Sequence, residues 1–406
     1  MVDLFAGVGG FSLGFMSAKQ DGAPPLYDVR LLVDVDGEAA ATFKQNHPRV
    51  AYWVQDLNTH AGSSAAALAA EIRRHARLSN DEDIDIVVGG PPCQGFSRLK
   101  KWSPDDPRNE RIFDYASLLL ELRPRMFLME NVPTLLSQTG EYLLDRFALL
   151  VEPLYDTKAE LVFANEYGVP QLRQRTIVVG FRRNAGLGTP FIPRGSYPRL
   201  TNARMLMPSE DDAGGGEIQR IAGSYITVED AIGDLPPLQP GEGAEAVPYG
   251  GPALTRFQAE RRQGSSLLFN HKARRHSKEF LEKIRIIEEG SRNQELADDQ
   301  RFSDTYFSQA YARLHRRGIA QTITTSFSNP GSGRFTHYRD LRSLTVREAA
   351  RLQSFDDRFR FFGVTETQQR HVGNAVPPLL ARALAMAYAR ALLGDVGQEA
   401  EPGAAG

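Results

Sequence analysis

The sequence predicts a doubly wound α/β fold, in which helices cover both faces of a central sheet. Across residues 1–181, short apolar runs of strand length alternate with stretches of helical periodicity. Several of these runs stop at Gly, Asp or Glu, and ligands of open α/β sheets bind beyond the carboxyl ends of the strands. The candidate strands are Val2–Phe5, Val29–Val33, Ile84–Val88, Met126–Met129, Glu160–Phe163 and Thr176–Phe181.

Helical patterns lie between these strands and again near the carboxyl end. The amino-acid composition changes from Asn184 to about Pro252, where Pro, Gly and Ser are frequent. Within that region, Thr227–Leu235 is predicted to be a short capped helix that stops at a Pro pair. The other helical candidates are Gly10–Ala18, Gly37–Asn46, Ser64–Arg77, Asp114–Leu122, Tyr142–Leu150, Leu344–Leu352 and Pro378–Leu393.

Composition and charge narrow the class of protein. The chain has 406 residues, 41% of them hydrophobic and 24% charged, which is enough for two domains with cores. A single cysteine excludes a disulfide framework and a cysteine-cluster zinc site, and it suits a reducing cytoplasm. No stretch approaches the roughly 18 continuous apolar residues of a membrane span, so we expect no membrane partner. The net charge of −2 does not indicate nucleic acid, but residues 256–317 are rich in Arg, Lys and His.

A glycine-rich turn follows the first candidate strand, in the stretch DLFAGVGGFSLGF at Asp3–Phe15. Glycines let a ligand approach the backbone, and the helix that follows offers free amide groups. The spacing matches neither GxGxxG nor GxxxxGK[ST], so it does not indicate a pyrophosphate cradle. A turn that serves only packing is the alternative.

Two acids beyond the next strands extend this pattern. Asp34 follows Val29–Val33, where a carboxylate could accept hydrogen bonds from ribose hydroxyls. Asp56 follows the run Val50–Val54, one strand further on. This arrangement fits an adenosine-bearing cofactor without a phosphate clamp, and S-adenosylmethionine fits better than NAD. Either acid could instead be a helix N-cap, a role that suits the neighbouring Asp36 best.

A thiol, an acid and arginines form a second group. Cys93, the only cysteine, directly follows a Gly-Gly-Pro-Pro stretch that cannot continue a central strand. Glu130 also ends an apolar strand, and Arg173 and Arg175 fall on one face of an extended chain. Together they could attack an electron-poor ring, with the thiol adding to carbon and the acid protonating a ring nitrogen. Separately they could be a buried cysteine, a surface acid and a solvated charge run.

The motifs that carry chemistry are DLFAGVGGFSLGF, GGPPCQGFS, ENV at Glu130–Val132, QLRQR at Gln171–Arg175, RSLTVREAARLQSF at Arg342–Phe355 and GNAVPP at Gly373–Pro378. In these motifs and their order, the sequence resembles the bacterial C5-cytosine DNA methyltransferases of the Dcm-like and restriction-modification type. The resemblance covers nearly the whole chain. It implies a mixed seven-stranded, Rossmann-like sheet of the kind found in S-adenosylmethionine-dependent methyltransferases, with a smaller DNA-recognition domain. The implied divisions are a catalytic and cofactor-binding domain at 1–182, a recognition domain at 183–339, a segment at 340–397 that returns to the catalytic domain, and a disordered tail at 398–406.

The resemblance also implies a role for individual residues. Cys93 would be the nucleophile, and Glu130 would contact N3 and the amino group of cytosine. Arg173 and Arg175 would secure the base and help to position the active-site loop. Asn374 would close over the methionine end of the cofactor, so the last helix is expected to pack beside the first strand. Residues expected to bind S-adenosylmethionine are Phe5, Gly7, Gly9, Gly10, Asp34, Asp56, Leu57, Pro92 and Asn374; no metal is expected.

The implied reaction begins with addition of the Cys93 thiolate to C6 of cytosine, which makes C5 enamine-like. Proton donation to N3 by Glu130 lowers that barrier, and methyl transfer, loss of the C5 proton and release of the thiol follow. Because C6 is inaccessible inside a stacked duplex, the base must be flipped out. The charged stretch Arg98–Arg111 resembles the family's mobile loop, which closes over the extruded base.

Double-stranded DNA is the implied partner, and the family's variable recognition region lies between QLRQR and RSLTVREAA. The basic run Asn270–Lys278 offers partners for phosphates, although it could also be a solvated face. Gln321–Gly333 carries short hydroxyl and amide side chains that can approach a base edge. The candidate DNA-binding residues are Gln94, Ser97, Arg98, Lys272, Arg274, Arg275, Thr324 and Thr325.

Two other functions stay open on the sequence alone. One is a catalytically silent DNA-binding relative with a regulatory role. Such a relative need not keep Cys93, Glu130 and the arginine pair, all of which are present here. The other is an RNA methyltransferase of the same fold, but the Cys-Phe-Thr stretch of the tRNA-directed relative is absent. For the DNA enzyme we expect a cytoplasmic monomer. A cognate restriction endonuclease could be encoded nearby without forming a stable complex.

Overall fold

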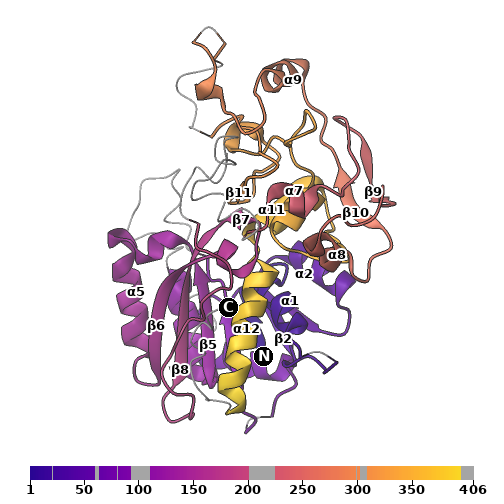
Figure 1. Cartoon of the computed structure of the whole chain (residues 1–406). Coiled ribbons are helices and arrows are strands. Elements are labelled where there is room, and N and C mark those ends of the chain that lie inside the picture. The colour runs from indigo at the N-terminus through magenta and orange to yellow at the C-terminus, as the bar shows by residue number, and fades with distance from the viewer. Residues whose placement is uncertain are drawn as a thin grey trace, which may run out of the picture.

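The structure is a computed structural model that describes residues 1–20, 22–59, 64–79, 81–92, 110–200, 225–298, 300–301 and 309–394. The predicted tail at 398–406 lies outside these residues. A large sheet with its helices forms the lower part of the molecule, and small strands and short helices form the upper part (Figure 1). The chain enters the upper part after the last long strand and returns to the lower part with its C-terminal helix (Figure 1).

The large sheet has seven strands and mixed pairing, as predicted. Its strands are β1 (Val2–Leu4), β2 (Leu31–Asp34), β3 (Ala51–Val54), β4 (Ile86–Gly89), β5 (Met126–Asn131), β6 (Tyr155–Phe163) and β8 (Gln174–Arg182). The order is β3-β2-β1-β4-β5-β8-β6. Pairing is parallel from β3 through β5, whereas β8 is antiparallel to both β5 and β6.

Side chains alternate along these strands, so the sheet contributes to a separate core on each face. Leu32 and Val88 belong to one core, whereas their chain neighbours Val33 and Val87 belong to the other. The first core includes residues of α1 (Gly10–Ser17), α2 (Gly37–Asn46) and α12 (Pro378–Leu393), and the second includes residues of α3 (Ala65–His75), α4 (Arg111–Leu122) and α5 (Gln138–Val151). This is the doubly wound arrangement that the sequence predicted.

The sheet order reverses beside its first strand. From β1 the chain continues to β2 and β3 on one side, and it then returns to β4 and β5 on the other. A crevice forms at such a reversal because the connections that follow β1 and β4 diverge. The glycine turn after Leu4 and the Gly-Pro-Pro stretch after Gly89 therefore flank one crevice.

Small elements build the upper part. They are α7 (Val228–Ile232), β9 (Gly243–Val247), α8 (Arg256–Arg262), β10 (Leu268–Lys272), α9 (Lys278–Arg285), α10 (Val346–Leu352) and α11 (Thr365–Asn374), together with a two-stranded parallel pair of β7 (Gln171–Leu172) and β11 (Ala320–Gln321). β9 and β10 form an antiparallel pair. The β7–β11 pair ties the QLRQR motif to the predicted recognition region.

Buried ion pairs stabilise this upper part. Arg342 lies 2.7 Å from both Asp340 and Glu348, and Arg351 lies 2.6 Å from Asp357. Glu348 and Arg351 are on α10, which packs against α7 and β10 of the recognition region and against α11. α10 is therefore part of the upper part, and α12 makes the return to the lower part (Figure 1).

The C-terminal helix packs along α1, the helix that follows the first strand, rather than on that strand itself (Figure 1). The two helices approach closely at Gly14, where a Cβ would lie 2.4 Å from the Cβ of Ala381. By length and composition alone, Thr365–Leu393 could cross a membrane, but 56% of its most apolar window is buried inside the fold. Burial of this kind is typical of a core helix.

The contact at Gly10 provides a test of how the two ends of the chain fit together. A Cβ on Gly10 would lie 2.2 Å from the backbone oxygen of Val376. Gly10→Ala must therefore displace one segment, and we expect the free energy of unfolding to fall by about 1–3 kcal/mol. Gly37→Ala is the matched control, because Gly37 also begins a helix but a Cβ there would meet nothing within 4 Å. Equal melting temperatures for the two variants would contradict the close contact.

Candidate active site

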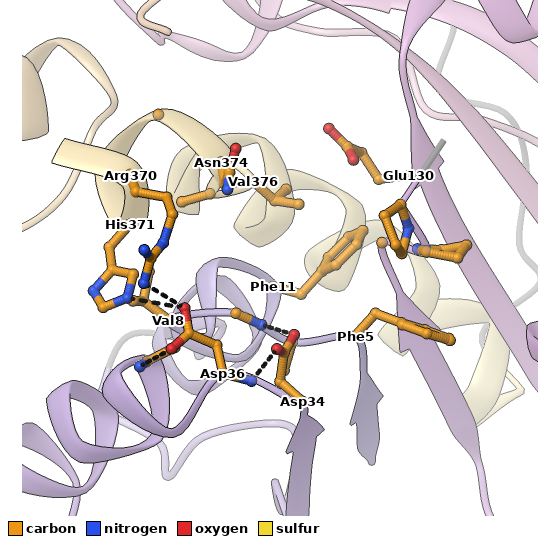
Figure 2. Close-up of a pocket in the computed structure, with 18 of the residues that line it drawn as sticks. Phe5, Val8, Phe11, Asp34, Asp36, Glu130, Arg370, His371, Asn374 and Val376 are labelled. Carbon is orange, nitrogen blue, oxygen red and sulfur yellow. Dashed lines mark hydrogen bonds and ion pairs between the residues drawn. The ribbon is translucent and has the colours of Figure 1, made fainter. Parts of the chain in front are cut away.

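A cavity of ≈ 800 Å³ opens at the carboxyl ends of β1, β2, β4 and β5. Figure 2 shows Asp34 on one side of it and Glu130 on the other, with Phe5 and Phe11 between them. Asn374 approaches from the C-terminal segment (Figure 2). A single cavity thus contains residues of both groups that the sequence singled out.

The glycine turn after β1 places a backbone amide against Asp34. Gly7 and Gly9 have φ angles of +52° and +80°, a left-handed conformation that favours glycine. The amide of Gly7 donates to Asp34 Oδ2 at 2.8 Å, and the amide of Asp36 donates to Asp34 Oδ1 at 2.9 Å. Burial raises the pKa of the Asp34 carboxyl, and these two amides oppose that rise. Each oxygen keeps a further acceptor site for a ligand hydroxyl.

Asp36 is the N-cap of α2, as the sequence favoured, and its carboxylate accepts hydrogen bonds from the amides of Glu38 and Ala39. It also pairs with Arg370 at 3.0 Å and lies 3.4 Å from the ring of His371, both on α11 (Figure 2). Burial alone would raise the pKa of Asp36, but the two amides and the charges of His371 and Arg370 hold it below its ordinary value. The N-cap thereby also joins the C-terminal segment to the cavity wall.

The cavity wall also contains residues that the sequence analysis assigned to no site, among them Val35, Arg370 and His371. Val35 is 66% exposed, so it offers the cavity an apolar surface next to Asp34. The sequence offered only weak signals for these three residues. Val35 is a hydrophobic residue between two acids, and Arg370 and His371 precede the GNAVPP motif. Nothing in the sequence around these residues distinguishes them from ordinary surface residues.

Asp3 lies deeper in the same cavity wall, on β1, and is 1% exposed. The amide and hydroxyl of Ser12 donate to its Oδ2 at 3.2 and 2.7 Å, and no described residue donates to its Oδ1. Burial raises the pKa of the Asp3 carboxyl to about 7, against the effect of the hydrogen bonds from Ser12. An ionised Asp3 therefore destabilises the fold when no ligand cation is present.

We expect Asp3→Asn to stabilise the protein increasingly as the pH rises. The pKa of Asp3 is about 7 in the folded state and 3.8 in the reference state, so its ionisation favours unfolding. The contribution of Asp3 to stability is fully present below its unfolded pKa and is lost as the pH rises through about 7. Between pH 5.5 and 8, the free energy of unfolding of the wild type should fall by about 2 kcal/mol relative to the variant. Thermal denaturation of the variant and the wild type across that range measures this. A difference in melting temperature that does not change with pH would contradict the buried, titrating carboxyl.

Glu130 and Arg175 form the other side of the cavity. Arg175 Nε lies 2.6 Å from Glu130 Oε1, and both side chains are largely buried. The N–H bond is not directed at that oxygen, and no described residue donates a hydrogen bond to it. The carboxyl group is thus held close to a cation, and its Oε1 is buried. Next to it, Asn131 Nδ2 donates to the backbone oxygen of Pro91 at 3.1 Å, which ties β5 to the segment that precedes Cys93.

Arg173 is in the cavity wall between the β7 strand and the C-terminal segment. Its side chain is 1% exposed, and its guanidinium donates to the backbone oxygens of Ile323, Gly373 and Ala375. Burial and the nearby charge of Arg175 lower the pKa of Arg173 well below its usual range. All three acceptors are backbone groups, and Nε of Arg173 has no hydrogen-bond partner among the described residues.

Comparison with known proteins identifies the family. A family model described as C-5 cytosine-specific DNA methylase matches residues 1–390. The chain belongs to this family. It is 31% identical to the Type II methyltransferase M.DdeI of Desulfomicrobium norvegicum, over 95% of this chain and 87% of the relative. It is 32% identical to M1.HphI of Haemophilus parahaemolyticus, over 95% and 85%.

Solved structures of methyltransferases share the fold. A DNA modification methyltransferase encoded within an Escherichia coli prophage matches with a TM-score of 0.69 and 26% identity, over 97% of this chain and 99% of that one. The Dnmt2 methyltransferase of Schizosaccharomyces pombe matches in fold with a TM-score of 0.53 at 15% identity. The family resemblance and the mixed seven-stranded fold are thereby confirmed, and the protein is a DNA (cytosine-5-)-methyltransferase.

Most of the expected cofactor residues of this methylase line its cavity. Phe5, Gly7, Asp34, Asp56, Leu57, Pro92 and Asn374 are all in the cavity wall. Gly9 and Gly10 instead support the turn: Gly9 packs against the ring of Phe43, and Gly10 packs against Val376. Asp56 lies 3.3 Å from Arg111, which also contacts Asp114.

The expected DNA-binding residues of the methylase fall into three groups. Thr324 and Thr325 are exposed in the cavity wall. Lys272, Arg274 and Arg275 are exposed outside it, and Arg274 donates to Ser328 Oγ at 3.4 Å, close in sequence to the threonines. Cys93 and the expected DNA contacts Gln94, Ser97 and Arg98 lie outside the described residues, as does most of the charged stretch that follows them.

Proposed function

We propose that this methylase transfers a methyl group from S-adenosylmethionine to C5 of a cytosine flipped out of duplex DNA, through a covalent bond between Cys93 and C6. The observation that carries this proposal is the single cavity with Asp34 on one side and Glu130 on the other (Figure 2). A nucleoside donor at the first side and a pyrimidine at the second would meet between them. Pro91 and Pro92, which precede the thiol, are in the same wall.

The cavity suits a nucleoside cofactor without a pyrophosphate. Asp34 offers acceptors for ribose hydroxyls, and Val35 offers an apolar surface for a base. All arginines in the described cavity wall already have protein partners: Arg111 contacts Asp56, Arg173 contacts backbone oxygens, Arg175 contacts Glu130, and Arg370 contacts Asp36 and Glu38. No arginine of the described cavity wall is therefore left without a protein partner to bind a phosphate. S-adenosylmethionine would supply an electrophilic methyl group on a sulfonium, and we assign its binding to Asp34, Asp56, Leu57 and Asn374.

The chain's own residues would carry the remaining steps. The Cys93 thiolate forms a bond to C6, and the electron pair of the C5–C6 double bond becomes available at C5 for methylation. Glu130 donates a proton to N3, which accepts the displaced charge, and Arg175 keeps the carboxyl group in place. After methylation, the C5 proton passes to solvent, the double bond re-forms as the C6–S bond breaks, the thiolate is released, and N3 returns its proton to Glu130.

Duplex DNA would lie across the upper part and the mouth of the cavity. Lys272, Arg274 and Arg275 are assigned to phosphates, because they are exposed cations near the hydroxyl-rich segment. Thr324 and Thr325 are assigned to the target site, because they are exposed in the cavity wall. Gln94, Ser97 and Arg98 are assigned to DNA on the sequence alone. Because the relatives are named Type II methyltransferases, we assign the protein to a restriction-modification system, acting as a cytosolic monomer.

The proposal is tested by incubating the protein with S-adenosylmethionine labelled in its methyl group, with duplex DNA or tRNA as the acceptor. We expect label in duplex DNA only. Bisulfite sequencing of DNA from an expressing host then gives the methylated sequence. Label in tRNA alone would assign the protein to RNA, and DNA binding without any transfer of label would make it a silent regulator.

A further inference from the structure

One buried guanidinium joins the two walls of the cavity that face different ligands. Arg173 donates to the backbone oxygen of Ile323 at 3.1 Å and to those of Gly373 and Ala375 at 3.2 Å each. Ile323 directly precedes the exposed threonine pair assigned to DNA. Gly373 and Ala375 flank Asn374, which is assigned to the cofactor. The same side chain therefore sets the position of a DNA-facing segment and of a cofactor-facing turn.

These two segments also touch each other directly. A Cβ on Gly373 would lie 2.5 Å from Thr324 C and 2.5 Å from Thr325 N, so the backbones are packed without room for a methyl group. Packed backbones of this kind move together rather than slide past one another. A shift of the turn at Asn374 must therefore shift the threonine pair.

A pair of buried glutamines makes a second connection between the same segments. Gln171 accepts a hydrogen bond from the amide of Ile323 at 3.0 Å, and its Nε2 donates to Gln353 Oε1. Gln353 in turn donates to the backbone oxygen of Ala375 at 2.7 Å. Both glutamines are fully buried, so water cannot replace these bonds at low cost. We call the contacts of Gln171, Arg173 and Gln353 with these two segments the Arg173 junction.

We propose that Arg173 is a positioning residue that couples the cofactor to the DNA, so that each ligand raises the affinity of the protein for the other. A ligand that orders the turn at Asn374 fixes the threonine pair through the Arg173 junction, and DNA that orders the threonine pair fixes the turn. Such coupling is reciprocal and typically changes affinity by about 5- to 150-fold. The inference rests on the proposed function, because both ligands must bind to this cavity.

The test measures the affinity for S-adenosylhomocysteine by calorimetry, with and without a DNA duplex. The duplex contains the target sequence that bisulfite sequencing identifies. We expect the wild type to bind at least about 5-fold more tightly with the duplex present. Arg173→Lys keeps the charge, but an ammonium cannot reach three carbonyls in a planar arrangement. The ratio of the affinities with and without DNA should therefore fall towards one.

The matched control is Arg347→Lys, since Arg347 is also fully buried and donates to the backbone oxygens of Phe269, Asp356 and Phe359 in the upper part. It should lower the melting temperature and keep the wild-type ratio, because its acceptors lie outside the junction. Should Arg173→Lys not fold, Gly373→Ala tests the same connection from the other side, because its methyl group forces the two segments apart.

A wild-type ratio in a folded Arg173→Lys or Gly373→Ala variant would overturn the inference. So would a wild type that binds both ligands independently, and in that case the proposed function would still stand. A wild type that binds neither S-adenosylhomocysteine nor duplex DNA would overturn the proposed function and the inference with it.

Discussion

Cys93→Ser should bring methyl transfer to duplex DNA below detection. A serine hydroxyl stays protonated near neutral pH and cannot replace the thiolate that adds to C6. The sequence supports the expectation, since Cys93 directly follows Pro92, a residue of the cavity wall. Asn131, next to Glu130 on β5, donates a hydrogen bond to the backbone oxygen of Pro91, two residues before Cys93.

The measurement has two parts, methyl transfer and covalent capture. A duplex that contains 5-fluorocytosine at the target position should form an adduct with the wild type that survives denaturation, because the fluorine at C5 cannot leave as a proton does. The chain has one cysteine, so a captured wild type and an uncaptured variant assign the bond to Cys93. Methylation by Cys93→Ser, or capture of that variant, would refute thiol catalysis.

Glu130→Gln should lower kcat by about 10²- to 10⁴-fold, the usual contribution of a positioned acid or base. An amide keeps the shape of the side chain but cannot transfer a proton to N3. It also alters the contact with Arg175, whose Nε lies 2.6 Å from Glu130 Oε1. The affinity for S-adenosylhomocysteine should stay within about threefold of the wild type, because Glu130 lies on the side of the cavity opposite Asp34 (Figure 2).

Glu166→Gln is the matched control for that substitution. Glu166 is also largely buried and pairs with an arginine, Arg199, at 3.0 Å, but it is not among the residues that line the cavity. We expect its kcat to equal that of the wild type. An equal loss of kcat in both variants would mean that the effect of Glu130→Gln comes from a lost ion pair and not from proton transfer.

The sequence predicted the lower part of the molecule well because local patterns determine it. Strands of alternating or continuous apolar residues, glycine at the turn after β1 and the proline pair after β4 are signals within a few neighbouring residues. They place Asp34 and Glu130 at one edge of a sheet, and the structure puts both in one cavity. Pro378–Leu393 was likewise predicted with the bounds that the structure gives to α12.

The parts that the sequence could not predict depend on partners far along the chain. Arg342, Arg347 and Arg351 would be typical of a solvated charged helix face, yet all three are fully buried. One partner of Arg351, Asp234, lies 117 residues away. The partners of Arg173 are equally remote, because its acceptors include backbone oxygens 150 to 202 residues further along the chain.

The contribution of Asn374 and Val376 to the cavity has a consequence for synthesis of the protein in the cell. The glycine turn is translated long before Asn374 and Val376, which line the same cavity. A nascent or prematurely terminated chain therefore lacks part of the site and should not modify the chromosome. Methyl transfer therefore requires that translation has passed Val376.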